Sequence, residues 1–220
     1  MNYKSMSTRF INLLRKHYLF VIPYLIFLVF AFFVEISFSK ADLFLLTNKY
    51  HSPFFDHFFM VITWLGDGKT VVLVGLSLCM VKYRYSVLTF FAFGYTSIIT
   101  YVLKVLFNAP RPCAFFEGKC EIRTVPGLET HSWNSFPSGH SASAFTLSVV
   151  LMHILPHKYR GFILFPLALI IIFSRVYLAQ HFFQDVVAGS ILGTFLTLQM
   201  IWWLENTEWY RSPKLDGKLF

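Results

Sequence analysis

Apolar residues gather along this chain in long stretches that are separated by shorter polar segments. A helix that crosses a membrane needs about 20 mainly apolar residues. The pattern therefore predicts an all-α integral membrane protein, an integral membrane six-helix bundle formed by residues 18–204. The six predicted spans are residues 18–38, 69–82, 86–107, 139–155, 161–179 and 184–204.

The second span is the shortest, and its start is ambiguous. Residues 69–82 follow an aromatic, amphipathic segment, residues 54–65, that ends at Gly66-Asp67-Gly68. Glycine interrupts helical patterns. Two interpretations therefore remain open: the span begins at the glycines, or it includes the preceding helix and is broken there.

The first span has a rival interpretation as a secretory signal peptide, because Ser37-Phe38-Ser39 imitates a small-x-small cleavage site. Its apolar core is longer than the roughly 7–15 residues of a signal peptide. We therefore expect residues 18–38 to be retained as a membrane span.

Composition supports membrane embedding. The chain has 220 residues, of which 56% are hydrophobic and 14% are charged, whereas soluble domains carry about 25% charged residues. The net charge of +8 is not arranged as a basic stripe with interleaved aromatic residues, so we expect no nucleic-acid partner. Membrane topology and an anionic substrate explain the charge better.

The distribution of Lys and Arg predicts the orientation, since cytoplasmic segments are rich in these residues. With the N-terminus inside, eleven of the nineteen Lys and Arg residues, including Lys158, lie on the inner side, and eight lie outside. Three of those eight belong to the polar clusters described next. Residues 1–17 and 205–220 are therefore predicted to be a cytoplasmic N-terminal segment and a cytoplasmic tail.

Three polar clusters interrupt the apolar pattern, at residues 104–112, 137–140 and 174–185. Ionisable residues at membrane depth are costly unless they are paired, hydrated or functional. Two spans lie between the long loop that carries the second cluster and the third cluster, so the chain returns to the same face. The clusters are predicted to meet on one side, which the orientation above makes extracytoplasmic.

The first cluster carries two cations, Lys104 and Arg111. They are seven residues apart, nearly two helical turns, so a helix would place both on one face, although Pro110 and Pro112 are expected to end that helix before Arg111. Considered alone, these cations are better explained as side chains that reach toward the membrane interface than as an anion site.

The second cluster, Pro137-Ser138-Gly139-His140, opens the fourth span. Ser138 suits a helix N-cap, and Gly139 permits close approach of a ligand to the backbone. Free N–H groups at a helix N-terminus bind anions such as phosphate, and His140 would stand in the first turn as a proton donor. An ordinary capped helix start explains this tetrapeptide equally well.

The third cluster contains Arg175, His181 and Asp185. A helix would place His181 and Asp185 on one face, where the carboxylate could fix the imidazole tautomer and leave the other nitrogen as a nucleophile. An incidental polar loop and a metal site are the alternatives. No His, Cys and Glu set has metal-ligand spacing, and the nearby cations would repel a metal ion.

Together, the clusters resemble the three-part signature of the type 2 phosphatidic acid phosphatase superfamily, in its bacterial membrane lipid phosphatase branch. Relatives of that superfamily include acid phosphatases and vanadium haloperoxidases. Eleven positions match in order: Lys104-x6-Arg111-Pro112, Pro137-Ser138-Gly139-His140 and Ser174-Arg175-x5-His181-x3-Asp185.

The resemblance implies a role for each matching residue. His181 would be the nucleophile that forms a phosphohistidine, Asp185 would orient it, and His140 would protonate the leaving oxygen and then activate water. The phosphate would be bound by Lys104, Arg111, Ser138, Gly139 and Arg175. No metal or cofactor is needed for this chemistry.

The implied activity is hydrolysis of a lipid-linked phosphate or diphosphate in the bacterial cytoplasmic (inner) membrane, with the site facing the periplasm or cell exterior. We favour undecaprenyl diphosphate as substrate, and phosphatidylglycerophosphate, phosphatidate and lipid A phosphates are the alternatives. A haloperoxidase is disfavoured because those relatives are soluble. An inactive membrane protein is disfavoured because every catalytic position is present. Oligomeric state is not predicted.

The signature does not constrain the segment 113–136. Cys113 and Cys120 flank a short loop and could form a disulfide in an oxidising compartment, whereas Cys79 lies in an apolar run as a core residue. His131 could touch the site, but a loop histidine is more often solvated.

The spacing within the third cluster also predicts a bend. On one continuous helix, Arg175 and His181 would be six steps of about 100° apart and would point to different faces, yet both need to reach one phosphate. We therefore expect a turn at residues 178–180, with Arg175 ending the fifth helix and His181 starting the sixth.

Overall fold

The computed structural model describes residues 3–156 and 159–219, and these form helices and loops without a strand. The predicted all-α class is therefore confirmed for the described chain. Lys158, which entered the charge count, lies outside the described residues. The elements in chain order are α1 (Tyr3–Lys16), α2 (Tyr18–Ser37), α3 (Lys40–Asn48), α4 (Pro53–Ile62), the 3-10 turn η1 (Thr63–Gly66), α5 (Gly68–Ser77), η2 (Leu78–Met80), α6 (Tyr83–Phe107), α7 (Pro112–Phe116), α8 (Gly139–Ile154), α9 (Arg160–Tyr177), α10 (Phe183–Glu205), α11 (Glu208–Arg211) and η3 (Pro213–Asp216).

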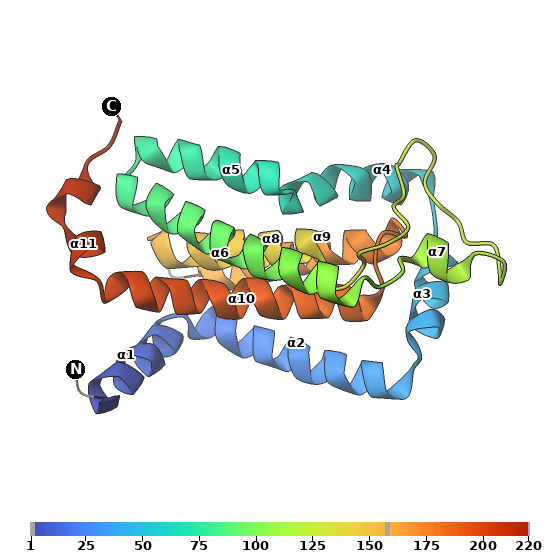
Figure 1. Ribbon diagram of the computed structural model, residues 1–220, viewed down its shortest axis with the longest axis horizontal. Helices are drawn as coiled ribbons and strands as arrows, with labels where there is room; N and C mark the ends of the chain where they lie inside the picture. Colours follow the sequence, from blue (N-terminus) through green and yellow to red (C-terminus); the bar gives the residue numbers. More distant parts are fainter. Residues whose placement is uncertain (1–2, 157–158, 220) are drawn as a thin grey trace.

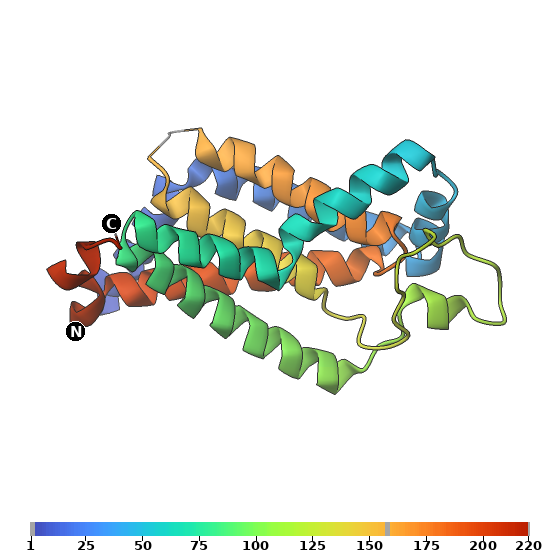
Figure 2. The same ribbon diagram turned by 90° about the horizontal axis from the view of Figure 1, so that it is seen from above.

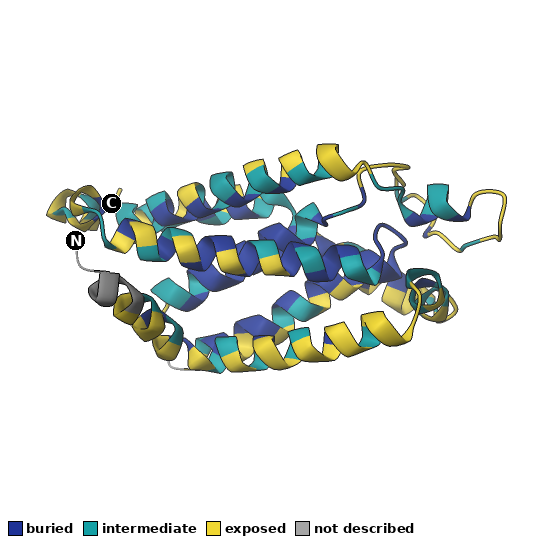
Figure 3. Ribbon diagram, turned by 60° about the horizontal axis from the view of Figure 1, so that its bottom comes forward, coloured by how far each residue is buried: buried dark blue, intermediate teal, exposed yellow. Residues whose placement is uncertain are grey.

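Helix α8 forms the centre of the bundle and packs against α6, α9 and α10 (Figures 1 and 3). Two glycines let α8 and α10 approach closely. A Cβ atom on Gly189 would lie 2.4 Å from the carbonyl oxygen of Ser138, and one on Gly193 would lie 2.4 Å from that of Ala142. Only glycine fits at such a distance, and the contact brings the starts of α8 and α10 together.

The outside of the bundle is apolar, as Figure 3 shows for the exposed face of α2. Ile26, Phe30 and Phe33 on that helix are 65%, 63% and 58% exposed. Large exposed apolar surfaces are unfavourable in water and mark contact with a membrane or a partner. In lipid this surface carries no such penalty, so the exterior agrees with a membrane-embedded protein.

Within the described residues, four helices are long and apolar enough to cross a membrane: α2, α6, α9 and α10. Their bounds agree with four predicted spans to within three residues. Helix α8 has 16 residues and is about 24 Å long, shorter than the roughly 30 Å apolar core of a bilayer. Because other helices surround α8, its length does not have to match the lipid.

The predicted second span, residues 69–82, falls on α5 and η2, which follow α4 and η1 across a sharp bend. Helices α4 and α5 together are apolar and long enough to cross, and they meet at a 55° bend (Figure 2). A Cβ atom on Gly66 would lie 2.7 Å from Ile171 and 3.1 Å from the His140 carbonyl oxygen. Asp67 then starts α5 as its N-cap, accepting a hydrogen bond from the Lys69 backbone N–H.

Helices α1, α3 and α7, and the single turn α11 in the predicted tail, are absent from the sequence-based prediction. Helix α1 lies within the polar segment 1–17, and it packs Leu13 into the core. Helix α3 begins at the N-cap Ser39 and buries Phe44. Helix α7 is a single turn after Arg111 that buries Phe116. Each is short or turns only one or two apolar residues inward, so its hydrophobic pattern is weak.

Candidate active site

The three polar clusters meet at one end of the bundle, beside α3 and α7 (Figure 1). Direct contacts connect them. The backbone N–H of Ser138 donates to the Asp185 carbonyl oxygen at 2.9 Å, and Arg111 Nη1 lies 3.3 Å from both oxygens of Gln180, its carbonyl and its side-chain amide. The three clusters therefore lie together at this end of the bundle.

The turn between Arg175 and His181 is also confirmed. Helix α9 ends at Tyr177, and Ala179 adopts a left-handed backbone conformation with φ of 56°. The backbone N–H groups of Gln180 and His181 both donate to the Arg175 carbonyl oxygen. His181 lies in this corner, two residues before α10, rather than in the helix itself.

Ser135 connects the His181 imidazole to the Asp185 carboxylate. Its hydroxyl donates to Asp185 Oδ2 at 2.5 Å and lies 3.4 Å from His181 Nδ1. The direct distance from His181 Nδ1 to Asp185 Oδ2 is 3.5 Å, at the limit of a hydrogen bond. The carboxylate also accepts the backbone N–H of Phe182 at 3.0 Å. This arrangement holds Nδ1 toward the acid and leaves Nε2 for attack on a substrate.

His181 is 1% exposed. Burial lowers the pKa of its imidazole well below 6.5, and the cations of Arg111, Arg175 and Lys104 lower the pKa further. A neutral imidazole has a lone pair, which a nucleophile requires. The surroundings therefore favour the neutral form of His181.

Arg175 reaches the same site from α9 and is 6% exposed. Its Nη1 donates to the Thr63 hydroxyl at 2.8 Å. Its Nε is buried and has no hydrogen-bond partner among the described residues. An oxyanion would satisfy such a donor, because guanidinium groups match the geometry of phosphate oxygens.

Backbone oxygens of the long loop (residues 117–138) hold the other two cations. Lys104 Nζ donates to the Asn134 carbonyl at 2.6 Å, and Arg111 Nε donates to the Trp133 carbonyl at 3.1 Å. The Lys104 side chain also passes over the start of α8, with Cε 3.7 Å from where a Cβ on Gly139 would lie. The loop thus sets the positions of both groups.

The start of α8 is built as an anion site. Ser138 is the N-cap, and its hydroxyl accepts the backbone N–H of Ser141 at 3.4 Å. His140 follows in the first turn, with Nε2 3.9 Å from Asp67 Oδ2 at the break of the second span. Asp67 is thus the described carboxylate nearest to the His140 imidazole.

Sequence reasoning missed Ser135, Thr63, Asp67 and Gln180 as members of the site. Asp67 had a usable signal, because a carboxylate between two glycines inside an apolar pattern is unusual. Thr63, Ser135 and Gln180 had none, since uncharged polar residues are common near membrane interfaces. His131 is exposed on the long loop. The loop contacts Lys104 and Arg111 through the backbone carbonyl oxygens of Asn134 and Trp133 instead.

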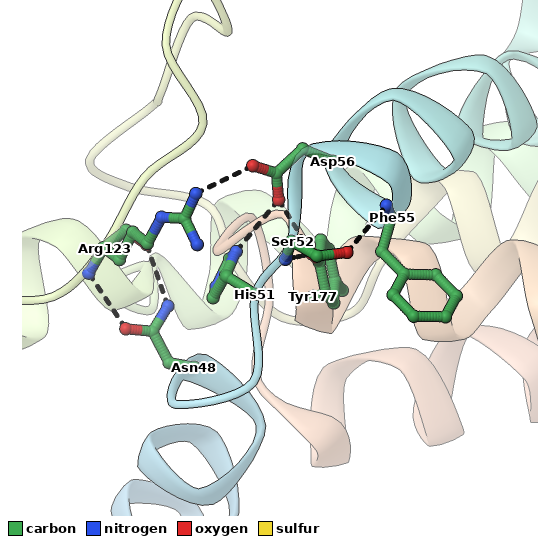
Figure 4. A network of polar contacts seen from close by, with 7 residues as sticks. All are labelled: Asn48, His51, Ser52, Phe55, Asp56, Arg123 and Tyr177. Carbon is green, nitrogen blue, oxygen red and sulfur yellow. Dashed lines mark hydrogen bonds and ion pairs between the residues drawn. The ribbon is translucent and has the colours of Figure 1, made fainter.

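A second polar network fixes the long loop to the bundle (Figure 4). The buried carboxylate of Asp56 on α4 accepts from Tyr177 Oη at 2.7 Å and from Arg123 Nη2 at 2.8 Å, and it lies 3.1 Å from His51 Nδ1. The Asn48 side chain pairs with the backbone N–H and carbonyl of Arg123. The loop is therefore attached to α3, α4 and α9.

The disulfide considered for Cys113 and Cys120 is not formed in this structure, where both residues carry free thiols. Cys113 lies on α7, and Cys120 follows the turn that ends this helix, its N–H donating to the Phe116 carbonyl. The helical turn and buried Phe116 lie between the two positions along the chain, which explains why the thiols do not meet here.

Comparison with known proteins agrees with this geometry. The model of the PAP2 superfamily matches residues 85–209, more than half of the chain, and this range contains all three clusters. The chain belongs to the PAP2 superfamily. It is therefore a membrane-embedded lipid phosphatase, a hydrolase, and the resemblance seen in the sequence is confirmed.

Individual PAP2 relatives include lipid phosphatases. A lipid A 4'-phosphatase of Bacteroides thetaiotaomicron is 24% identical over 166 residues, covering 70% of this chain and 72% of that protein. The crystal structure of Aquifex aeolicus LpxE has a TM-score of 0.65 at 30% identity, covering 73% of this chain and 93% of that one. A PAP2-type phosphatidylglycerolphosphate phosphatase from Bacillus subtilis has a TM-score of 0.62 at 26% identity, covering 86% and 96%.

Proposed function

We propose that this PAP2 protein hydrolyses a lipid-linked phosphate through a phosphohistidine on His181. The observation that carries the proposal is the neutral, buried imidazole of His181, oriented by Ser135 and Asp185 and placed among three phosphate-binding cations. Such preorganised cations stabilise the charge that develops on a transferring phosphoryl group.

The reaction proceeds in two steps. His181 Nε2 attacks phosphorus, the bond between phosphorus and the lipid oxygen breaks, and protonated His140 donates its proton to that oxygen. A water molecule then attacks the phosphohistidine while neutral His140 accepts the water's proton, and the phosphorus–nitrogen bond breaks to release phosphate. Lys104, Arg111 and Arg175 bind the phosphoryl oxygens throughout, with the Ser138 hydroxyl and the Gly139 N–H.

The substrate class follows from the site and the relatives' names. Two relatives are named for lipids that carry a phosphate monoester, lipid A and phosphatidylglycerophosphate. With these names added to the sequence, we favour a lipid phosphate monoester as substrate. Undecaprenyl diphosphate, which the sequence alone favours, becomes the alternative. A panel of these lipids and phosphatidate, assayed with one preparation, ranks them by kcat/KM.

The same assay tests the mechanism. Purified protein should release phosphate with a chelator present, and His181→Ala should lower kcat by at least about 10³-fold, as removal of a nucleophile does in other hydrolases. Release that needs a divalent metal ion, or that survives the substitution, would contradict the proposal.

We further propose six crossings of a bacterial cytoplasmic membrane, by α2, α4–α5, α6, α8, α9 and α10, with the site outside and both termini in the cytoplasm. In support, both termini lie at the end of the bundle opposite the site (Figure 1). Cys120 is exposed on the site side. An impermeant maleimide should label it in intact cells and should not label Cys120→Ser at that position. Labelling of Cys120 only after permeabilisation would reverse the orientation.

A further inference from the structure

The end of the bundle opposite the catalytic histidines, where α1 and α11 lie (Figure 1), carries three adjoining hollows lined by basic side chains. Their volumes are about 370, 400 and 370 Å³, within the range of small-molecule sites. Lys16, the last residue of α1, lines all three, and Glu205 and Arg211 line two of them. The hollows therefore adjoin one another at Lys16.

The central hollow, which we call the basic hollow, has an excess of positive charge. Lys16, Arg84 and Arg211 contribute three cations to its lining, and Glu205 contributes one carboxylate. A general excess of cytoplasmic Lys and Arg does not require them to converge. Other basic residues of this end, such as Arg15 and Lys82, line none of the three hollows.

Several donors in this region have no acceptor. Arg84 Nη2 pairs with Asp216 at 3.0 Å, but Arg84 Nε is buried without a partner among the described residues. Trp202 Nε1, in the adjoining hollow, is also buried and has no hydrogen-bond partner among the described residues. Arg211 uses its Nε for the Glu205 carbonyl oxygen, and no described carboxylate lies within 4.0 Å of Lys16. Unpaired buried donors are costly and call for an acceptor.

The carboxylate of Glu205 is already engaged by His153, which in turn contacts His17. His153 Nε2 lies 3.0 Å from Glu205 Oε1, and His153 Nδ1 lies 3.2 Å from His17 Nε2. Burial lowers the pKa of His17 to about 3, with help from the neighbouring His153 and Lys16, so His17 is neutral. Glu205 is thus held by a hydrogen-bonded chain, and Arg84 is paired with Asp216, so Lys16 and Arg211 are the two lining cations without a described carboxylate within 4.0 Å.

We propose that the basic hollow is a second anion site, which binds a phosphate group on the side of the molecule opposite the catalytic centre. Phosphate oxygens are the acceptors that a set of Lys and Arg donors binds best. Two sources supply this chemistry, the headgroup of an anionic phospholipid in the adjacent leaflet and free inorganic phosphate. The inference is independent of the reaction proposed for the catalytic site.

Thermal unfolding of the full-length protein in a non-ionic detergent tests the proposal. Arg175→Ala serves as the background, because it weakens phosphate binding at the catalytic centre. Inorganic phosphate at constant ionic strength and phosphatidylglycerol are titrated separately, with phosphatidylcholine as a zwitterionic control. The test variant adds Lys16→Gln and Arg211→Gln, and the matched control adds Arg15→Gln and Lys82→Gln, which remove the same charge from the same end.

We expect phosphate or phosphatidylglycerol to raise the unfolding temperature of the background and of the control variant. The test variant should need at least about tenfold more ligand for half of the effect. A tenfold weaker affinity corresponds to the loss of about one charged hydrogen bond. A response to phosphate identifies the free ion as a sufficient ligand, and a response to phosphatidylglycerol alone identifies the headgroup. With Arg175 intact, Lys16→Gln/Arg211→Gln should retain phosphatase activity, which shows that it folds.

Three results would overturn the proposal. The first is no stabilisation by either ligand beyond that of phosphatidylcholine. The second is an unchanged half-effect concentration in the test variant. The third is an equal loss in the test and control variants, which would mean that diffuse charge, rather than the basic hollow, attracts the anion.

Discussion

Ser135 shows how much of the site depends on a residue without charge. Its hydroxyl donates to Asp185 and faces His181 Nδ1, so it carries the orienting effect of the carboxylate to the nucleophile. Ser135→Ala should lower kcat by roughly 10–100-fold, the usual effect of losing such an outer contact, with a smaller change in KM.

Ser132→Ala is the matched control in the same loop, because Ser132 contributes its backbone carbonyl to Arg111 and its side chain is exposed. It should retain near-normal kcat. Equal activity of Ser135→Ala and the unsubstituted protein would show that Asp185 orients His181 without the hydroxyl.

The lowered pKa of His181 predicts a pH dependence of stability. In the unfolded chain its pKa is about 6.5, so below that pH the unfolded state binds a proton that the folded state does not bind. Titration of this residue therefore leaves the free energy of unfolding unchanged above pH 6.5. Below that pH the free energy of unfolding falls by about 1.4 kcal/mol per pH unit.

Unfolding of the wild type and of His181→Asn, which does not titrate, should be compared between pH 7.5 and 5. The wild type should lose more stability than the variant on acidification. Parallel curves would mean that His181 protonates in the folded protein as it does in the unfolded chain.

Sequence and structure agree most closely at the residue scale. Lys104, Arg111, Arg175, His181 and Asp185 were recognisable because charge is rare in an apolar pattern, and each lies in the site. The hydroxyl groups of Ser135 and Thr63 were not recognisable, because only their spatial proximity distinguishes them from other serines and threonines.

At the scale of elements, the contact between α8 and α10 decides whether the second and third clusters meet. Gly193→Ala would place a Cβ 2.4 Å from the Ala142 carbonyl oxygen, so the helices must separate. We expect a loss of roughly 1–3 kcal/mol, as in other overpacked cores, together with reduced kcat.

Gly94→Ala in α6 is the matched control, since a Cβ there meets nothing within 4 Å. Because alanine favours helix by up to about 1 kcal/mol over glycine, this variant should unfold at an equal or higher temperature. A Gly193→Ala protein as stable as Gly94→Ala would contradict the close helix contact.

The attachment of the long loop makes another prediction for an element. Arg123→Gln removes the ion pair with Asp56, and the Arg123 side chain is 45% exposed, so the effect is modest. A pair of this kind contributes up to about 1 kcal/mol, or about fivefold in an equilibrium. We expect KM to rise by up to that factor and proteolysis of residues 117–138 to accelerate.

Lys119→Gln removes the same charge from the same loop without breaking an ion pair among the described residues. It should change neither KM nor the rate of proteolysis. Equal KM values and equal rates of proteolysis for the two variants would show that the ion pair with Asp56 does not position the loop.

The second span shows why elements were harder to predict than residues. Periodicity located the apolar run after Gly68, but it left open whether the aromatic segment 54–65 belongs to the same span. Contacts of Gly66 with Ile171 and His140, distant in sequence, explain the bend at this position. Helices α1, α3 and α7 depend in the same way on a few side chains that pack against remote elements.

At the scale of the whole molecule, the bundle separates two charged ends. One end gathers the catalytic residues, and the other carries the basic hollow, with α8 running between them in a nearly fully buried position. The apolar exterior predicted from composition surrounds this arrangement. The sequence could establish that the clusters share a face by counting spans, because that argument needs no packing detail.

The central claim is that His181 carries the phosphoryl group during the reaction. It is tested most directly by mixing the protein with a lipid phosphate, quenching rapidly in base, and locating the phosphorylated residue by mass spectrometry. His140→Ala mixed with an activated aryl phosphate provides the sharpest sample, because that leaving group needs no proton from His140, whereas the variant still lacks the group that activates water for the second step. The phosphoryl group should accumulate on His181 in that variant and be absent from His181→Ala. A phosphoryl group on another residue, or turnover without any phosphorylated protein, would contradict the mechanism.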